Sequence, residues 1–162
     1  MVAQIPRLRR YAYSLTGDSS RGDDLVQECL ERAWSRRRLY DAARPIRPWL
    51  FTILHNLHVN QIRRNAAEPM IVSSDSPDAV HAQASNEPGA VDLRDLQRAL
   101  DLLAPLHREV LILVGLEQLS YRETAKSLGV PVGTVMSRLS RAREQLRQHL
   151  QGDISVAIRG VK

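Results

Sequence analysis

The sequence has one cysteine and few aromatic side chains, and it has no long apolar run. Cys29 is the only cysteine among 162 residues, so no intrachain disulfide can form and a reducing compartment is expected. No stretch approaches the roughly 18 apolar residues that span a bilayer. The first fifteen residues also lack the apolar core of a signal peptide. These absences predict a cytoplasmic protein with no membrane insertion.

Aromatic residues make up 4% of the chain, and alternating Val, Ile and Thr runs are scarce, which disfavours a sheet. Leu, Ala, Arg, Glu and Gln are abundant and form helices well, so an all-α fold is expected. The formal charge is +5, and Arg supplies nearly all of the cations because Lys126 and Lys162 are the only lysines. Arg suits bidentate contact with phosphates and guanine edges, so nucleic acid is a candidate partner.

Three helices are predicted in the first part of the chain. The first spans about Pro6–Leu15, and the second begins at an N-cap, Ser19 or Ser20, with two aspartates in its first turn. The third spans about Trp49–Arg64 after a proline-marked loop, Asp41–Pro48. Helical spacing predicts these buried positions: Leu25, Val26, Cys29, Leu30, Ala33, Trp34, Leu50, Ile53, Leu54, Leu57 and Ile62.

A segment without apolar periodicity divides the chain. Residues 66–90 are rich in Pro and Ser and bury too little apolar area to offset ordering entropy, which predicts a flexible linker. We therefore expect two small helical domains, residues 1–65 and 91–152, and a tail at 153–162. The second domain begins with leucines spaced by three and four, and Pro105 suits the first turn of its next helix.

A helix-turn-helix is predicted in the second domain. Ser120 and Glu123 form a capping-box pattern, and Gly129 suits the left-handed turn that ends the first helix, Tyr121–Leu128. Ala125, Gly129, Val135 and Leu139 follow one another at spacings of four, six and four, which is typical of a helix-turn-helix. The second helix is predicted to span Val132–Leu150, and its buried stripe consists of Val135, Leu139, Ala142 and Leu146.

The opposite face of this second helix carries Thr134, Ser137, Arg138 and Arg141. Short hydroxyl donors and arginines near a helix start are the residues that read base edges in a major groove. Arg143 and Arg147 lie toward the flanks, where phosphate contact is expected instead. A surface helix solvated by arginines is the alternative reading of the same pattern.

Three blocks of this sequence, in order, resemble the extracytoplasmic-function (ECF) sigma factors of bacterial RNA polymerase. Leu119–Leu150 is similar to region 4 of that family, which binds the promoter −35 element. Gly22–Trp34 is similar to the region 2 motif that docks on the β′ clamp of the polymerase. Arg47–Arg64 is similar to the following part of region 2, which melts and reads the −10 element. The resemblance implies an alternative sigma factor that directs promoter-specific initiation.

The resemblance also implies residue roles. Polymerase binding falls to Asp24, Leu25, Val26, Gln27 and Glu28, of which Leu25 and Val26 are also plain core positions. The −10 contacts fall to Arg44, Arg47, Asn56, Asn60, Arg63 and Arg64. The −35 contacts fall to Pro131, Gly133, Thr134, Met136, Ser137, Arg138 and Arg141. Two residues depart from the family pattern: Met136 stands where Lys or Arg is usual, and Asn60 stands where Asp is usual.

The partners implied are the core polymerase, through its β′ clamp and β flap, promoter DNA and an anti-sigma factor. Two alternatives stay open: a sigma mimic that titrates an anti-sigma factor, and a stand-alone helix-turn-helix regulator. His55 and His58 lie three apart on a helix, but no third ligand is near in sequence, so no metal site is expected. No nucleophile is paired with a base and no phosphate loop occurs, so neither an enzyme nor a cofactor is predicted.

Overall fold

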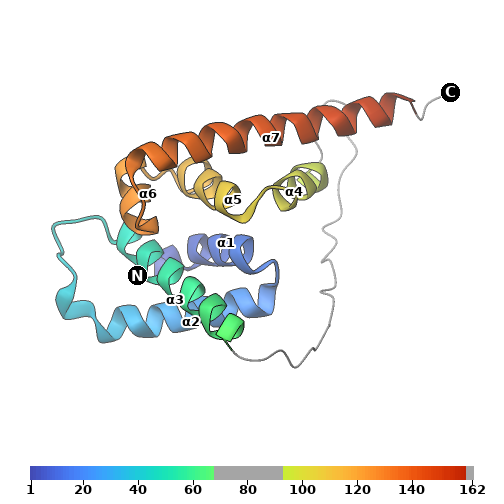
Figure 1. Ribbon diagram of the computed structural model, residues 1–162. Helices are drawn as coiled ribbons and strands as arrows, with labels where there is room; N and C mark the ends of the chain where they lie inside the picture. The colour runs from blue at the N-terminus through green and yellow to red at the C-terminus, as the bar shows by residue number, and fades with distance from the viewer. Residues whose placement is uncertain (68–92, 160–162) are drawn as a thin grey trace.

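The structure is a computed structural model that describes residues 1–67 and 93–159, with side chains for 1–66 and 96–150. All regular elements in these ranges are helical, which confirms the all-α prediction (Figure 1). The N-terminal half contains η1 Val2–Gln4, α1 Ile5–Thr16, α2 Ser19–Ser35, η2 Arg37–Leu39 and α3 Ile46–Ala67. The C-terminal half contains α4 Leu93–Asp101, α5 Pro105–Leu111, η3 Ile112–Leu116, α6 Tyr121–Leu128 and α7 Val132–Arg159.

The turn between α1 and α2 shows a different cap from the one predicted. Asp18 is the N-cap of α2, and its carboxylate accepts a hydrogen bond of 2.7 Å from the backbone N–H of Arg21. The prediction of Ser19 or Ser20 is therefore wrong by one or two positions, and the first turn of α2 contains no acidic residue. Gly17 precedes the cap at φ +69°, a left-handed conformation that glycine adopts without steric cost.

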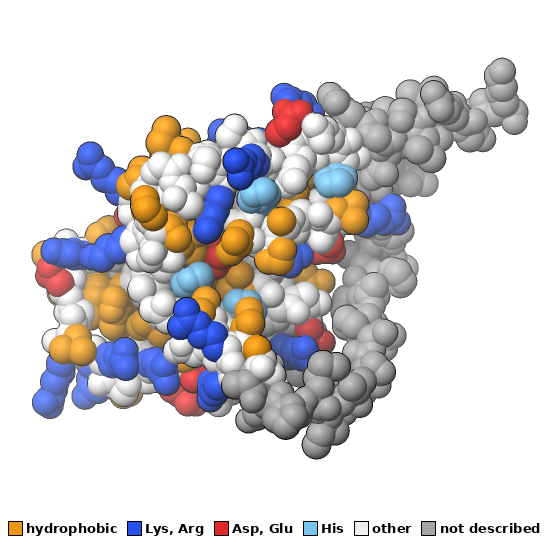
Figure 2. Space-filling view, in the orientation of Figure 1, with side chains coloured by type: hydrophobic (Ala, Val, Ile, Leu, Met, Phe, Trp, Pro, Cys, Tyr) orange, Lys and Arg blue, Asp and Glu red, His pale blue; other side chains and the backbone are white. Residues whose placement is uncertain are grey.

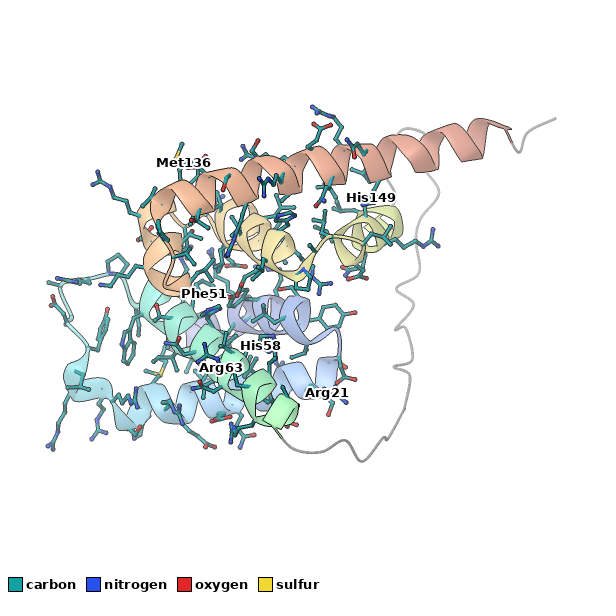
Figure 3. The ribbon with its side chains drawn as sticks, viewed as in Figure 1. Arg21, Phe51, His58, Arg63, Met136 and His149 are labelled. Atoms are coloured by element: carbon teal, nitrogen blue, oxygen red, sulfur yellow. The ribbon has the colours of Figure 1, made fainter. Side chains whose placement is uncertain are left out.

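The core of the N-terminal half lies where α1, α2 and α3 meet. Leu8, Tyr11, Val26, Leu50 and Leu54 are among its buried residues, and the Tyr11 ring packs edge-on against Phe51 with centroids 5.2 Å apart. Figure 3 shows Phe51 pointing inward from α3.

Two residues predicted in that core are exposed instead. Trp34 is 64% exposed near the end of α2, and Ile62 is 54% exposed near the end of α3. Trp34 lies next to the fully buried Ala33, so α2 is still covered there and the indole lies on the exposed face beside the buried stripe. Ile62 lies beyond Leu57, the last buried residue described in α3.

The C-terminal half has its own buried residues, arranged under the long helix α7. The predicted stripe of α7 is confirmed at Val135, Leu139 and Ala142, while Leu146 is only partly buried. Figure 1 shows α7 extending across α6, α5 and α4. The helix continues past Leu150 into the segment predicted as a tail, and the predicted linker lies largely outside the described residues.

The two halves pack against each other, an arrangement that the sequence did not predict. Helix α1 lies against α5, and α3 lies against α6 (Figure 1). Buried apolar side chains form one continuous cluster across the seam, in which Leu8 and Leu54 belong to the same core as Val110 and Leu113. The described part of the chain is therefore a closed body.

Candidate functional site

The exposed side of α2 is the first candidate surface. Asp24 and Gln27 are exposed and Glu28 is partly buried, so these three side chains are available to a partner. Leu25 and Val26 are 3% and 4% exposed, so they hold α2 in the core and present their neighbours. Asp24, Gln27, Glu28 and Glu31 line a shallow hollow, and the Gln27 amide donates to Glu31 over 3.1 Å. The surface is acidic and suits a basic partner.

Trp34 extends this acidic surface, although the sequence pattern placed it in the core. Positions 24, 27, 31 and 34 follow helical spacing on one face, so the exposed indole lies in line with Asp24 and Gln27. The Arg37 guanidinium lies 4.8 Å above the indole ring, which is within cation–π range. An exposed Trp beside an Arg is typical of interface hot spots. Helical spacing counted from Asp24, through Gln27, places Trp34 on this exposed face.

The segment between α2 and α3 is held by contacts within itself and with the start of α3. Tyr40 packs against Trp49 with ring centroids 5.0 Å apart, and its hydroxyl donates to the carbonyl of Arg44. Asp41 accepts a hydrogen bond of 3.0 Å from the backbone N–H of Ala43 and forms an ion pair of 3.1 Å with Arg44. These contacts leave the Arg44 side chain exposed at the tip of the loop.

The outer part of α3 forms the second candidate surface. Asn56, Asn60, Arg63 and Arg64 are all exposed, and the last three line a groove with Glu28, Arg32 and Leu57 of α2 and α3. Arg63 points outward from this part of α3 in Figure 3. Figure 2 shows Lys and Arg side chains over the segment between α2 and α3 and over α3 itself. This surface offers amides and cations to an anionic chain.

Arg47 differs from the other predicted −10 residues because it is partly buried and faces the other half of the protein. The pKa of Glu123 in α6 is lowered by its hydrogen bonds with Ser120, despite some desolvation, and Arg47 lowers it further through charge. Arg47 therefore also takes part in the contact between α3 and α6.

The helix-turn-helix has the predicted geometry. The Ser120 hydroxyl accepts from the backbone N–H of Glu123 over 3.2 Å, and the Glu123 carboxylate accepts from the backbone N–H of Ser120 over 2.8 Å. Gly129 ends α6 at φ +64°, as predicted. Ala125 is 6% exposed and allows α6 and α7 to approach closely. The capping box and the glycine turn fix the angle at which α7 begins.

The first turns of α7 form the third candidate surface. Thr134 and Arg138 are partly buried, and the others predicted to contact the −35 element are exposed: Pro131, Gly133, Met136, Ser137 and Arg141. The Ser137 hydroxyl donates to the carbonyl of Thr134 over 3.1 Å. Met136 is 52% exposed and points away from the body of the protein (Figure 3). The structure therefore places all seven residues predicted to contact the −35 element in or next to the first three turns of α7, with the apolar Met136 among them.

A polar cluster lies in the seam between the halves, and sequence reasoning did not find it. The Tyr11 hydroxyl donates to Glu109 over 2.6 Å, and Nδ1 of His55 lies 2.7 Å from the same Glu109 oxygen. Burial, followed by the negative charge and hydrogen bond of Glu109, raises the pKa of Tyr11 well above its ordinary value. His55 thus has a carboxylate partner. Among the side chains that the structure describes, no three His, Cys, Asp or Glu residues are grouped as a metal site.

A second carboxylate, Glu117, lies in the same seam. Its side chain is fully buried, and it forms ion pairs of 3.0 Å with Arg10 and 3.7 Å with Arg7. Helical periodicity does not identify these partners, because Arg10 and Arg7 are 107 and 110 residues away from Glu117 in sequence.

In the described helices, none is both long and apolar enough to cross a membrane.

The fold and its surfaces define a class: a helical, two-part protein whose C-terminal part is a helix-turn-helix. Family comparison agrees, since residues 1–55 match the family described as the Sigma2 domain of PhyR, and residues 93–146 match sigma-70 region 4. The chain is 36% identical over 156 residues to the ECF sigma factor EcfG of Rhodopseudomonas palustris, covering 94% of this chain and 84% of that protein. The chain belongs to the ECF sigma factors of bacterial RNA polymerase.

Solved structures show the same relationship. The sigma factor RpoE of Bartonella quintana, in complex with the anti-sigma factor NepR, superposes with a TM-score of 0.74 at 33% identity, covering 93% of each chain. The anti-anti-sigma factor PhyR of the same organism shares the fold at 19% identity, with a TM-score of 0.56 over 90% of this chain and 47% of that one. As an ECF sigma factor, the protein binds core RNA polymerase and directs promoter-specific initiation. Sigma factors are not enzymes.

Proposed function

We propose that the three surfaces divide the work of initiation. The α2 surface, Asp24, Gln27 and Glu28, binds the polymerase β′ clamp, and Leu25 and Val26 support it from the core. The α3 surface and the loop before it bind the −10 element through Arg44, Arg47, Asn56, Asn60, Arg63 and Arg64. The start of α7 reads the −35 element. Residues 1–65 and 91–152 are then the two working domains.

One observation carries this assignment: the predicted polar contact residues are exposed or half-exposed on or beside three separate helices, while Leu25 and Val26 are buried and support α2 from the core. A helix start can enter a major groove directly, and a basic face beside an aromatic pair can hold an unstacked strand. Opening a strand costs a few kcal/mol per extruded base, and the cationic α3 surface can offset part of this cost through phosphate contacts.

Variant holoenzymes test the three assignments separately. Core polymerase is mixed with the wild-type chain, Asp24→Ala, Arg63→Ala or Arg141→Ala, and core binding and run-off transcription are both measured. We expect Asp24→Ala to weaken core binding. Arg63→Ala should retain core binding but lose strand opening, and Arg141→Ala should lose about 10- to 100-fold in affinity for the −35 duplex. Equal effects of all three variants on core binding would refute the division.

We also propose that an anti-sigma factor with the chemistry of NepR binds this chain. The support is the 33% identity over 93% of the chain to the sigma factor that is bound to NepR. The protein would then act in the cytoplasm, where the polymerase and the promoter are, and without catalytic activity of its own. Release of core polymerase when a NepR-type protein is added to the holoenzyme tests this partner.

A sigma mimic is the second candidate, because residues 1–55 match the Sigma2 domain of PhyR, an anti-anti-sigma factor. A mimic would bind the anti-sigma factor without supporting transcription. The exposed basic residues of α3 and the intact start of α7 favour a working sigma factor, since a mimic has no need to bind DNA. Promoter-specific transcripts from the reconstituted holoenzyme would exclude the mimic.

A further inference from the structure

A cationic groove lies between α2 and α3, where α3 packs across α2 (Figure 1). It encloses about 480 Å³, and three of the side chains that line it are arginines. The residues that line it are Glu28, Arg32, Leu57, Asn60, Arg63 and Arg64. Leu57 is 2% exposed and forms the floor. The groove therefore combines three cations, one amide and one carboxylate above an apolar base.

The wall formed by α3 is open to an anion. Asn60, Arg63 and Arg64 are three and four residues apart, so their side chains share one face of the helix. Among the ion pairs of the described side chains, none involves Arg63 or Arg64. Guanidinium groups bind phosphate through two parallel hydrogen bonds. A volume of this size fits a nucleotide-sized group, whereas a duplex, whose major groove alone is about 12 Å wide, is too wide to enter. The groove thus suits the phosphates of an unpaired strand.

Arg32 lines the groove from α2 and was not predicted to contact DNA. One of its guanidinium nitrogens lies 3.6 Å from the Glu28 carboxylate. This distance is too long for a hydrogen bond, and an ion pair between side chains that are 40% and 46% exposed is weak. Glu28 therefore neutralises Arg32 in the free chain without holding it firmly, and a better placed anion can replace the carboxylate.

Glu28 also belongs to the acidic hollow on α2. That hollow is lined by Asp24, Gln27, Glu28 and Glu31, so Glu28 lines both the hollow and the groove. Its carboxylate cannot pair fully with Arg32 and with a basic group of a partner at the same time. A cation seated in the hollow would draw the carboxylate away from Arg32 and leave a third guanidinium in the groove without an anion.

We propose that Arg32 is a further contact for the unpaired −10 strand and that Glu28 controls it. In the free chain Glu28 neutralises Arg32. When a basic residue of the polymerase pairs with Glu28, Arg32 binds a strand phosphate beside Arg63 and Arg64. The inference rests on the proposed function for the identity of both partners. Core binding and strand binding are then linked through one carboxylate, so each strengthens the other by the same factor.

The chain offers a matched control for each residue. Arg32→Ala and Arg9→Ala each remove an arginine that pairs with a carboxylate of α2, but Arg9 pairs with Asp23 over 2.8 Å and neither of those two residues lines the groove. Glu28→Gln and Glu31→Gln each remove one negative charge from the acidic hollow, but Glu31 does not line the groove. All four substituted side chains are at least partly exposed, so none of these changes opens a cavity in the core.

The first measurement uses the free full-length chain and a fluorescein-labelled strand of thymidines, titrated by anisotropy from low salt upward. Glu28→Gln should raise the affinity for the strand about twofold to fivefold. Its salt slope should steepen by about 0.7, the value of one phosphate contact on a single strand. Glu31→Gln should leave the salt slope unchanged. In an Arg32→Ala background, Glu28→Gln should bring no gain, because Arg32 is no longer there to be released.

The second measurement adds saturating core polymerase, and the binding of the strand by core polymerase alone is subtracted. Glu28→Gln should now bind the strand as the wild type does, because a basic group of the polymerase already pairs with Glu28 in the wild type. Arg32→Ala should lower the affinity for the strand about threefold to tenfold. Arg9→Ala should bind as the wild type does.

Several results would overturn the inference. They are equal salt slopes for free Glu28→Gln and Glu31→Gln, an undiminished gain from Glu28→Gln without Arg32, and equal strand affinities for Arg32→Ala and Arg9→Ala in the holoenzyme. Absence of strand binding by free Glu28→Gln at low salt would also overturn it. Displacement of the strand by thymidine monophosphate at the same nucleotide concentration would assign the groove to free nucleotides instead.

Run-off transcription by the wild-type holoenzyme separates this inference from the proposed function. Promoter-specific transcripts without the dependence of Glu28→Gln on Arg32 reject the inference alone. That dependence in the free chain, without promoter-specific transcripts, rejects the proposed function alone.

Discussion

The Tyr11 hydroxyl donates a hydrogen bond of 2.6 Å to Glu109, although 98 residues separate the two in sequence. Both residues are buried, and the bond joins the two halves of the protein. Removal of the hydroxyl by Tyr11→Phe should lower the free energy of unfolding by about 1–2 kcal/mol. The same change in a Glu109→Ala background should cost much less, with a coupling energy of about 0.5–3 kcal/mol.

Urea denaturation of the four proteins in this cycle measures the coupling. Tyr13→Phe on the same helix is the control, because Tyr13 is exposed and its hydroxyl should contribute less than about 0.5 kcal/mol. Strictly additive effects of Tyr11→Phe and Glu109→Ala would show that the bond does not stabilise the closed body.

The exposed Trp34 should be a binding residue and not a folding residue. Trp34→Ala should weaken core polymerase binding by about 10- to 100-fold, the range of interface hot spots. The free energy of unfolding should change by less than about 0.5 kcal/mol, because the indole is 64% exposed. Titration of labelled core polymerase and urea denaturation measure the two quantities.

Trp34→Phe should retain part of the polymerase affinity, since a ring remains beside Arg37. Tyr13→Ala removes an exposed aromatic ring from α1, away from this surface, and should bind core polymerase as the wild type does. If Trp34→Ala binds as tightly as the wild type, the indole lies outside the interface.

The sequence predicted the elements well because their signals are local. The capping box of Ser120 and Glu123, the glycine at 129 and the buried stripe from Val135 each depend on residues within a few turns. Trp34 was misplaced because it borders the buried stripe beside Ala33, and spacing does not give the width of that stripe. Ile62 was misplaced because the covered part of α3 ends near Leu57, and spacing does not say where another helix stops covering it.

The seam was not predictable for a related reason. Glu109 and Glu117 look like ordinary surface glutamates in the sequence, and only the packing of α1 on α5 brings their partners within hydrogen-bond distance. The separate surfaces on α2, α3 and α7 could be located from the sequence. The relationship between the halves could not.

Met136 is an apolar residue at the centre of the surface assigned to the −35 element. Met136→Arg should increase affinity for −35 duplexes and raise the salt dependence of binding by about one phosphate contact. Binding of labelled duplex by the holoenzyme, at several salt concentrations, measures both effects. Met136→Leu keeps the side chain apolar and should bind as the wild type does. An unchanged salt slope for Met136→Arg would place position 136 away from the DNA backbone.

Cys29 should be unreactive in the folded protein. Burial, with a smaller effect of the Glu28 charge, raises the pKa of its thiol to about 12, and the thiol lies 3.5 Å from the carbonyl of Leu50. A thiol reagent at pH 8 should modify the chain rapidly in urea and very slowly without it. Rapid modification of the folded chain would contradict the burial of Cys29.

The same pKa shift predicts a loss of stability in alkali. The folded state holds the proton of Cys29 more tightly than the unfolded state does, so the thiol contributes stability that is lost as pH rises above the unfolded value of 9.0. This stability should be lost progressively between about pH 9, the unfolded pKa, and about pH 12, the folded pKa. Cys29→Ala should lose less stability across this window than the wild type, as measured by urea midpoints.

Genome-wide run-off transcription tests the central claim most directly. Sigma-free core polymerase is mixed with the wild-type chain and fragmented genomic DNA, and the 5′ ends of the transcripts are sequenced. We predict start sites that share one two-part motif at the −35 and −10 positions, with transcripts lost for both Asp24→Ala and Arg141→Ala. Start sites without a shared motif, or the same starts from core polymerase alone, would contradict the assignment of these surfaces to promoter-directed initiation.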